Sequence, residues 1–418
     1  MGKLIISGGG GLNGQVRLQG AKNSVLPILA ATVLCAGKSV IKNCPALKDV
    51  YATFKILESL GCDVTYENGI ATVNSANITN HYISEGLMRE MRSSILFLGP
   101  LLARCGKAVI SQPGGCELGP RPIDLHMKAF RRMGVDIQEL HGYISCGSDR
   151  VKGQHIHLTF PSVGATENIM LLAVLADGET VISNAAKEPE IVDLQNFLKG
   201  CGADVKGAGT ETVTIKGVDN LHSVTHEVIP DRIVAATYLS AAAACGGDVL
   251  ITGAEPDHVQ SVLTVLEEAG CEITQGVNFV RLRHDGPLRA VNVIKTQPYP
   301  GFPTDAQAPV MAALAAAQGT SVFIENIFES RYKHAGELIR LGADITVDGR
   351  VAVIRGVEQL SGTSVEATDL RGGAAMIVAG LAARGLTEIS GLQHIDRGYE
   401  DAVRDLTALG AEIRRVES

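Results

Sequence analysis

Gly202-Ala-Asp-Val205 is one copy of the short motif that decides the fold of this chain. The motif is a glycine, a small residue, an acidic residue and a β-branched residue, and it occurs six times. The six copies begin at Gly61, Gly134, Gly202, Gly270, Gly342 and Gly410. Subtracting neighbouring residue numbers gives spacings of 73, 68, 68, 72 and 68. So even a period indicates an internal repeat of about 70 residues.

Each copy of the motif has the same kind of neighbours. An amphipathic helix pattern, such as residues 257–269, precedes the glycine, which then serves as its C-cap. Two short alternating runs follow around a tight turn, as at Asn68-Gly69. A second helix pattern, rich in Ala and Leu and nearly free of charge, lies earlier in each repeat and is expected to be buried. These buried helices are predicted at 24–35, 94–105, 168–176, 233–245, 307–318 and 373–384.

The ends of the chain predict how the six repeats are grouped. The sixth repeat stops soon after Ile413, without a second hairpin strand, whereas residues 3–7 and 15–19 read as surplus strands. We therefore expect the N-terminal residues to complete the sixth repeat. With three repeats per domain, one domain is predicted at 22–229 and the other at 1–21 together with 230–418. Two chain crossings at one point predict a hinge, with a cleft between the domains.

Composition excludes several classes of protein. The 418 residues carry a formal net charge of −8, which argues against general binding to nucleic acids or to membrane surfaces. Nine scattered cysteines without a C-x-x-C pair favour reduced thiols in a cytosolic protein. The N-terminus enters a strand pattern at once and lacks the apolar core of a signal peptide, so a cytoplasmic location is expected.

One segment, residues 111–124, has neither a helix nor a strand period. It holds three prolines and three glycines around Cys116 and Arg121. A polar loop of this length is typical of a lid or a binding loop, and a thiol near cations can act as an acid or a nucleophile. An ordinary turn with an exposed thiol is the alternative.

Polar residues gather at the starts of the predicted buried helices. They are Lys22-Asn23-Ser24, Arg89 with Arg92-Ser93-Ser94, Ser162-Val-Gly164, Asp231-Arg232, Thr304-Asp305 and Asp369-Leu-Arg371. Helix N-termini attract anions, so these residues could line a site for strongly anionic ligands. Simple N-capping is the alternative for the three aspartates, and a structural ion pair is the alternative for Arg232 and Arg371. Lys22 has the wrong sign for a helix N-terminus, which favours a functional role.

Two arginines, Arg331 and Arg397, precede surface-helix patterns, where they could bind phosphorylated substrates or form ordinary salt bridges. No metal site is expected at His222 and His226, because the β-branched residues around them indicate an extended segment rather than a shared helix face.

Taken together, the motifs resemble those of the enolpyruvyl transferases that act on UDP-N-acetylglucosamine. They are Gly20-Ala-Lys-Asn23, Pro113-Gly-Gly-Cys116, Arg121-Pro-Ile-Asp124-Leu125-His126, Ser162-Val-Gly-Ala-Thr166, Pro230-Asp-Arg232, Phe302-Pro-Thr-Asp305, Thr368-Asp-Leu-Arg371 and His394-Ile-Asp-Arg397-Gly-Tyr399. The resemblance implies two similar domains, each an inside-out α/β barrel of three repeats. It also implies transfer of the enolpyruvyl group of phosphoenolpyruvate to the 3′-hydroxyl of UDP-N-acetylglucosamine, the first committed step of peptidoglycan synthesis, with no metal or organic cofactor.

The resemblance assigns roles to individual residues. Cys116 would be the general acid at carbon and could form an adduct with phosphoenolpyruvate, and Asp305 would be the base. Lys22, Arg121 and Arg397 would hold phosphoenolpyruvate. The contacts to UDP-N-acetylglucosamine would come from Asn23, Arg92, Arg121, Pro122, Ile123, Asp124, Leu125, Ser162, Val163, Gly164, Asp305 and Ile327. Arg331, Asp369 and Arg371 are further candidates for substrate binding. Phe160 stands where some members carry a lysine, which puts a uridine contact there in doubt.

Two other functions are alternatives. A non-catalytic paralogue that binds a UDP-sugar would be expected to lose Cys116, Lys22 or Asp305, and this chain has all three. The related enolpyruvylshikimate-phosphate synthases share the fold and the phosphoenolpyruvate chemistry but lack the Pro-Gly-Gly-Cys loop.

Overall fold

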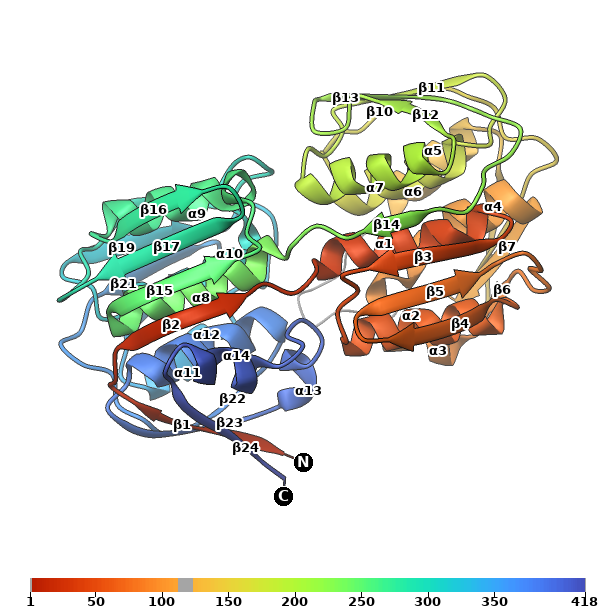
Figure 1. The fold of residues 1–418 in the computed structure, drawn as a ribbon. Coiled ribbons are helices and arrows are strands. Elements are labelled where there is room, and N and C mark those ends of the chain that lie inside the picture. Colours follow the sequence, from red (N-terminus) through yellow and green to blue (C-terminus); the bar gives the residue numbers. More distant parts are fainter. Residues whose placement is uncertain (1, 112–122, 418) are drawn as a thin grey trace. The chain divides into compact units, whose positions relative to one another are not determined.

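The computed structural model describes residues 2–111 and 123–417, which form a mixed α/β structure (Figure 1). The described residues belong to two compact units. One unit begins at Gly20 and ends at Ile229, and the other comprises the residues up to Gln19 and those from Pro230 onward. The chain therefore passes from one unit to the other after Gln19, whereas the sequence led us to expect the boundary after Ala21.

The strands of the described residues form six four-stranded sheets with one common topology. In each sheet the first two strands are parallel, and the remaining neighbours are antiparallel. The first sheet of the 20–229 unit has the strand order β14 (Thr225–Glu227), β3 (Lys38–Lys42), β5 (Ile70–Asn74), β4 (Asp63–Glu67). The second has the order β6 (Tyr82–Ile83), β7 (Lys107–Ser111), β9 (Tyr143–Gly147), β8 (Asp136–Leu140). The third has the order β10 (His155–His157), β11 (Glu179–Ser183), β13 (Thr212–Lys216), β12 (Asp204–Lys206).

The other unit repeats this order three times. Its first sheet has the strand order β2 (Leu12–Arg17), β15 (Gly247–Thr252), β17 (Phe279–His284), β16 (Glu272–Gly276). The second has the order β18 (Val293–Lys295), β19 (Thr320–Ile324), β21 (Val351–Arg355), β20 (Asp344–Asp348). The third has the order β22 (Ser364–Glu366), β23 (Gly385–Ser390), β1 (Lys3–Gly8), β24 (Glu412–Val416). The six sheets correspond to the six repeats that the sequence predicted.

The N-terminal strands join two different sheets. β1 lies between β23 and β24, with Ile6 opposite both Thr387 and Ile413, so the prediction that the N-terminus completes the sixth repeat is confirmed for this strand. The second surplus strand was expected to do the same, and that expectation is wrong. β2 instead pairs in parallel with β15, where Val16 lies opposite Ile251.

The helices fall into the two predicted classes. Those of the 20–229 unit are α1 (Lys22–Ala31), η1 (Thr32–Leu34), α2 (Lys48–Ser59), α3 (Glu85–Glu90), η2 (Arg92–Phe97), α4 (Leu98–Cys105), α5 (Asp124–Arg132), α6 (Val163–Ala173) and α7 (Pro189–Gly200). Those of the other unit are α8 (Arg232–Cys245), α9 (Pro256–Glu268), α10 (Thr304–Leu314), α11 (Ala335–Arg340), α12 (Leu370–Ala382), α13 (Leu392–Ile395) and α14 (Ala402–Ala408).

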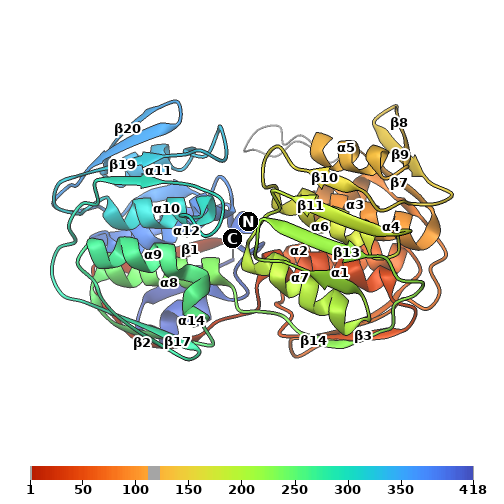
Figure 2. The same ribbon diagram turned by 90° about the horizontal axis from the view of Figure 1, so that it is seen from above.

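The apolar helices are buried, as predicted. In α1 every residue from Ser24 to Ala31 is buried, and α8, α10 and α12 pack against one another (Figure 2). The helix predicted at 94–105 is divided between the 3₁₀ helix η2 and α4, which begins at Leu98 and has Pro100 in its first turn. Each unit has its own apolar core, built mainly of Ala, Val, Ile and Leu.

The chain passes between the two units at residues 19–20 and again at 229–230, and within each unit a backbone hydrogen bond links these two segments. The amide of Ala21 donates to the carbonyl of Ile229 at 2.7 Å within one unit, and the amide of Asp231 donates to the carbonyl of Gln19 at 3.0 Å within the other. Gly20 lies so close to Asn43 that a Cβ at this position would be 1.8 Å from the Asn43 carbonyl oxygen. The first crossing therefore requires glycine.

Candidate active site

Asp305 is the centre of a charged cluster in the unit that contains α10. One carboxylate oxygen, Oδ1, lies 2.7 Å from Nη2 of Arg331, and the other, Oδ2, lies 2.7 Å from Nη2 of Arg371. The arginine side chains are 3% and 8% exposed, whereas that of Asp305 is 26% exposed. The two buried guanidinium groups stabilise the charge of the carboxylate and fix its orientation, and part of the carboxylate remains accessible.

The three aspartates at the helix starts differ in role. Asp231 is the N-cap of α8 and accepts the backbone N–H groups of Ile233 and Val234 at 2.8 and 3.1 Å. Asp369, a predicted substrate-binding residue, caps α12 in the same way through the N–H groups of Arg371 and Gly372. Asp305 is not a cap, because α10 begins at Thr304 and the N-cap is Pro303. Asp305 instead has its carboxylate between two arginine side chains.

Arg371 is also surrounded by polar groups from other helices. Burial acts to lower its pKa, but the carboxylate charges of Asp305 and Asp231 outweigh this effect and the pKa of Arg371 is raised. Tyr399 is buried beside it, and its hydroxyl is 2.8 Å from Oγ1 of Thr237 on α8. The guanidinium group therefore remains charged although it is almost inaccessible to water.

Glu325 is a site residue that the sequence analysis missed. Its side chain is fully buried, and Oε1 accepts the backbone N–H groups of Ile327 and Phe328 at 2.8 and 2.9 Å. Its other oxygen accepts the hydroxyl of Thr304 at 3.0 Å. Glu325 thereby links the segment of Ile327 to the first turn of α10. The only signal in the sequence was an acidic residue at the end of an apolar strand run.

Lys22 is the first residue of α1 and lies in the other unit. Its Nζ atom is 2.8 Å from Oδ2 of Asp49, and the two side chains are 13% and 3% exposed. Asp49 belongs to the first turn of α2. Asn23 follows in α1 and is half-buried. This partner of Lys22 was not predictable from the sequence, because Asp49 has the ordinary pattern of an acidic residue at a helix start.

A buried histidine in the first turn of α5, His126, joins that helix to α6 and α4. Nδ1 of His126 is 3.0 Å from the amide nitrogen of Asn168, whose oxygen accepts the backbone N–H of Gly99 at 2.8 Å. Burial lowers the pKa of His126 to about 4, against the opposing charge of Asp124, so the ring is neutral near pH 7. These contacts connect α4, α5 and α6 close to several predicted substrate-binding residues. Those residues are Ile123, Asp124, Leu125, Ser162, Val163 and Gly164.

The remaining predicted residues have varied positions. Cys116, Arg121 and Pro122 lie outside the described residues. Arg92 is the first residue of η2. Arg397 follows α13, and the next residue, Gly398, accepts a hydrogen bond at 3.1 Å from the side chain of Gln19. The side chain at Phe160 is 42% exposed.

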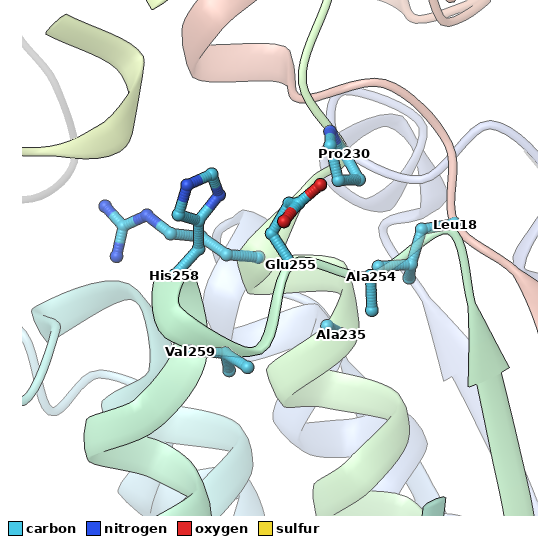
Figure 3. Close-up of a pocket in the computed structure, with 8 residues that line it drawn as sticks. Leu18, Pro230, Ala235, Ala254, Glu255, His258 and Val259 are labelled. Atoms are coloured by element: carbon cyan, nitrogen blue, oxygen red, sulfur yellow. The ribbon is translucent and has the colours of Figure 1, made fainter. Parts of the chain in front are cut away.

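Among the described residues, no three His, Cys, Asp or Glu side chains come together to hold a metal ion. Within the same part of the chain, no helix has the length and apolar character needed to cross a membrane. A shallow hollow lies beside Pro230 and is lined by Leu18, Arg232, Glu255 and His258, among others (Figure 3). Arg232, one of the cationic candidates at the helix starts, lines this hollow, and its guanidinium lies over the Tyr299 ring, 5.6 Å from the ring centre.

Comparison with known proteins identifies relatives along the whole chain. A family model described as EPSP synthase (3-phosphoshikimate 1-carboxyvinyltransferase) matches residues 6–406. UDP-N-acetylglucosamine 1-carboxyvinyltransferase 2 of Caldanaerobacter subterraneus subsp. tengcongensis is 52% identical over 416 residues, covering 100% of both chains. UDP-N-acetylglucosamine 1-carboxyvinyltransferase of Geobacter metallireducens is 47% identical over 417 residues, again with 100% of both chains covered.

Two solved structures are similar over the full length. The enolpyruvyl transferase NikO from Streptomyces tendae superposes with a TM-score of 0.89 at 27% identity, covering 100% of this chain and 99% of that chain. EPSP synthase from Acinetobacter baumannii superposes with a TM-score of 0.75 at 20% identity, covering 100% of each chain. The second likeness concerns the fold alone.

Proposed function

The chain belongs to the EPSP synthase (3-phosphoshikimate 1-carboxyvinyltransferase) family, and from this membership we propose that it transfers the enolpyruvyl group of phosphoenolpyruvate to the 3′-hydroxyl of UDP-N-acetylglucosamine. One observation carries the choice of acceptor. Relatives that are 47–52% identical over the full chain are named UDP-N-acetylglucosamine 1-carboxyvinyltransferase. The reaction releases phosphate and is the first committed step of peptidoglycan synthesis.

We propose that each unit is an inside-out α/β barrel of three repeats. The mutual packing of α8, α10 and α12, together with the six sheets of identical topology, supports this arrangement. Such a barrel brings the first turns of its buried helices to a common end. This is where Asp305 and Arg371 lie in one unit, and Lys22 and Asn23 in the other.

In the proposed reaction, the sugar hydroxyl oxygen attacks C2 of phosphoenolpyruvate while C3 takes up a proton, giving a tetrahedral ketal. Loss of a proton from the new methyl group then restores the double bond as the C–O bond to phosphate breaks. Asp305 takes the hydroxyl proton. Each of its oxygens accepts one arginine and keeps a second lone pair, so the carboxylate can act as a base while it is held in place.

The remaining roles are assigned by likeness. Cys116 donates the proton to C3, and Lys22, Arg121 and Arg397 compensate the charges of the phosphate and carboxylate groups. Lys22 suits this task because it lies at a helix N-terminus, where backbone N–H groups also favour an anion. Asp49 orients the ammonium group from the side of α2.

A phosphate-release assay tests the proposal. The purified chain is incubated with phosphoenolpyruvate and either UDP-N-acetylglucosamine or shikimate 3-phosphate, and the products are identified by mass spectrometry. We expect phosphate release and an enolpyruvyl ether with the UDP-sugar alone. Release only with shikimate 3-phosphate, or binding of the UDP-sugar without any product, would overturn the proposal.

A further inference from the structure

We infer that Asp193 is a positioning residue for phosphoenolpyruvate, because it fixes the first turn of α1 through Ser24. The inference rests on the proposed function, which places Lys22 and Asn23 in that turn against the substrates. Asp193 lies in the middle of α7, and its side chain is 3% exposed. Neither α7 nor this residue belongs to any motif of the predicted site.

The first turn of α1 lacks the usual stabilising groups. Its N-cap is Ala21, which has no side chain able to cap, and the turn contains no acidic residue. It contains Lys22 instead, whose positive charge opposes the helix dipole. The missing negative charges come from other helices. Asp49 of α2 pairs with Lys22 at 2.8 Å, and Asp193 of α7 accepts the Ser24 hydroxyl at 2.5 Å.

Asp193 holds two further groups besides Ser24. Oδ1 is 2.8 Å from Nε2 of His226, and Oδ2 accepts the backbone N–H of Ile229 at 3.2 Å. The His226 ring stands edge-on to Phe197, with centres 5.7 Å apart and planes at 89°, so its orientation is fixed as well. A buried carboxylate that accepts three donors is a strong anchor, because each donor would lose its partner if the carboxylate were removed.

The three donors come from the places where the chain enters and leaves this unit. Ser24 follows the first crossing by a few residues, and Ile229 is the last residue before the second. The amide of Ala21 also donates to the carbonyl of Ile229. Asp193 therefore links the start of α1 to the segment by which the chain leaves this unit. Lys22 is fixed in two ways, by its own ion pair with Asp49 and by the contact between Ser24 and Asp193 in the same helical turn.

Ser24→Ala tests the inference with a minimal change, since it removes one hydroxyl and leaves the other two contacts of Asp193 in place. We expect KM for phosphoenolpyruvate to rise about tenfold, the scale of a lost hydrogen bond to a charged group, with a smaller change in kcat. KM for UDP-N-acetylglucosamine provides the internal comparison. The effect should vanish in a Lys22→Ala background, because a residue that acts only through Lys22 has nothing left to position.

Asp405→Asn is the matched control. Asp405 is a buried carboxylate of the other unit that accepts the hydroxyl of Tyr238 at 2.9 Å and pairs with Arg404. We expect it to lower the melting temperature while KM for phosphoenolpyruvate stays unchanged. If Ser24→Ala behaves in the same way, with lower stability and an unchanged KM, Asp193 is structural and the inference is wrong.

Two variants at Asp193 add a graded comparison. In Asp193→Asn the amide oxygen can still accept from Ser24 and Ile229 while the amide nitrogen faces His226, whose ring can change tautomer. Asp193→Ala removes every acceptor. We expect KM for phosphoenolpyruvate to increase from wild type to Asp193→Asn to Asp193→Ala. If Asp193→Ala does not fold, Ser24→Ala still tests the inference.

An inactive wild-type chain would contradict the proposed function, whereas an active chain with an unchanged KM in Ser24→Ala would contradict this inference alone.

Discussion

Nη2 of Arg371 lies 2.7 Å from Oδ2 of Asp305, although 66 positions separate the two residues in the chain. Arg331 holds the other oxygen at the same distance. The pairing ties two buried guanidinium groups to one partly exposed carboxylate. A residue in this position is sensitive to a change of charge, both in stability and in reactivity.

Asp305→Asn should therefore affect both properties. An amide can accept from only one arginine, and its nitrogen faces the other, so we expect a loss of roughly 3 kcal/mol in the free energy of unfolding. If Asp305 is the base, kcat should also fall by at least about 100-fold. Urea denaturation and steady-state kinetics measure the two effects.

Asp248→Asn is the control for this prediction. Asp248 also pairs with two arginines, Arg281 and Arg283, but on the exposed surface of β15. We expect almost no change in stability and unchanged kinetics, because solvent screens an exposed ion pair. An Asp305→Asn variant that turns over at the wild-type rate would exclude the base role.

Lys22→Ala should raise the phosphoenolpyruvate concentration needed for half-maximal rate by about ten- to a hundredfold, since a charged contact to the substrate is lost. It should also destabilise the chain, because Asp49 is 3% exposed and loses the ammonium group of its ion pair. Lys55→Ala, which removes an exposed ion pair with Glu90, is the control. Reduced thermal stability with normal kinetics would show that Lys22 is structural.

Gly20→Ala should destabilise the protein strongly. The added methyl group would lie 1.8 Å from the backbone oxygen of Asn43, and the chain crossing would have to move to avoid it. Gly86→Ala is the comparison, because no atom lies within 4 Å of a Cβ placed there and alanine favours the helix. Thermal melts of the two variants should shift in opposite directions. A Gly20→Ala protein that melts at the wild-type temperature would contradict the close contact.

Stability should fall as the pH drops from about 6.5 towards 4. Burial lowers the pKa of His126 to about 4. Burial also lowers the pKa of His334 to about 4, where the charge of Asp369 acts to raise it and the charge of Arg331 acts to lower it. Well above pH 6.5 both imidazole rings are neutral in the folded and in the unfolded protein, so they do not make stability depend on pH. Below pH 6.5 only the unfolded state takes up the protons, at a cost of up to roughly 3 kcal/mol for each histidine.

Urea denaturation across this pH range measures the slope, and His126→Gln should flatten it. The exposed His155→Gln is the control and should leave the slope as it is. Equal slopes in wild type and His126→Gln would mean that His126 is protonated in the folded state.

Cys116 lies outside the described residues, so its test rests on the family resemblance. A phosphonate epoxide that mimics phosphoenolpyruvate should label Cys116, and UDP-N-acetylglucosamine should accelerate the labelling. Cys116→Asp should resist the epoxide yet turn over, with a pH optimum shifted to the acid side, because a carboxyl group can donate the proton when nearby anions raise its pKa. A Cys116→Asp variant that binds both substrates and forms no product would show that the thiol is required as a nucleophile.

The repeat architecture was predictable because it depends on local patterns. The Gly-x-acid motif with its hairpin repeats at an even period, and each copy forms the same four-stranded sheet. The truncated sixth repeat also indicated that β1 would complete it. The partner of β2 was not predictable in this way, because a short alternating strand matches either sheet, and its pairing with β15 is a long-range contact.

The site was predictable as a set of helix starts but not as a set of pairs. Asp231, Asp305 and Asp369 look alike in the sequence, since each lies just before an apolar helix pattern. The difference arises because α10 begins one residue before Asp305, whereas α8 and α12 begin one residue after their aspartates. A shift of this size is within the ordinary uncertainty of a helix boundary read from sequence.

The position of β1 between β23 and β24 sets an order for events on the ribosome. β1 is synthesised first, but both of its partners are synthesised last. At about 5–20 residues per second, their emergence is separated by on the order of 20 to 75 seconds. The 20–229 unit does not contain this strand and can fold while translation of the other unit continues. β1 must meanwhile remain without its two sheet partners, and a chaperone that binds nascent chains could bind it during that interval.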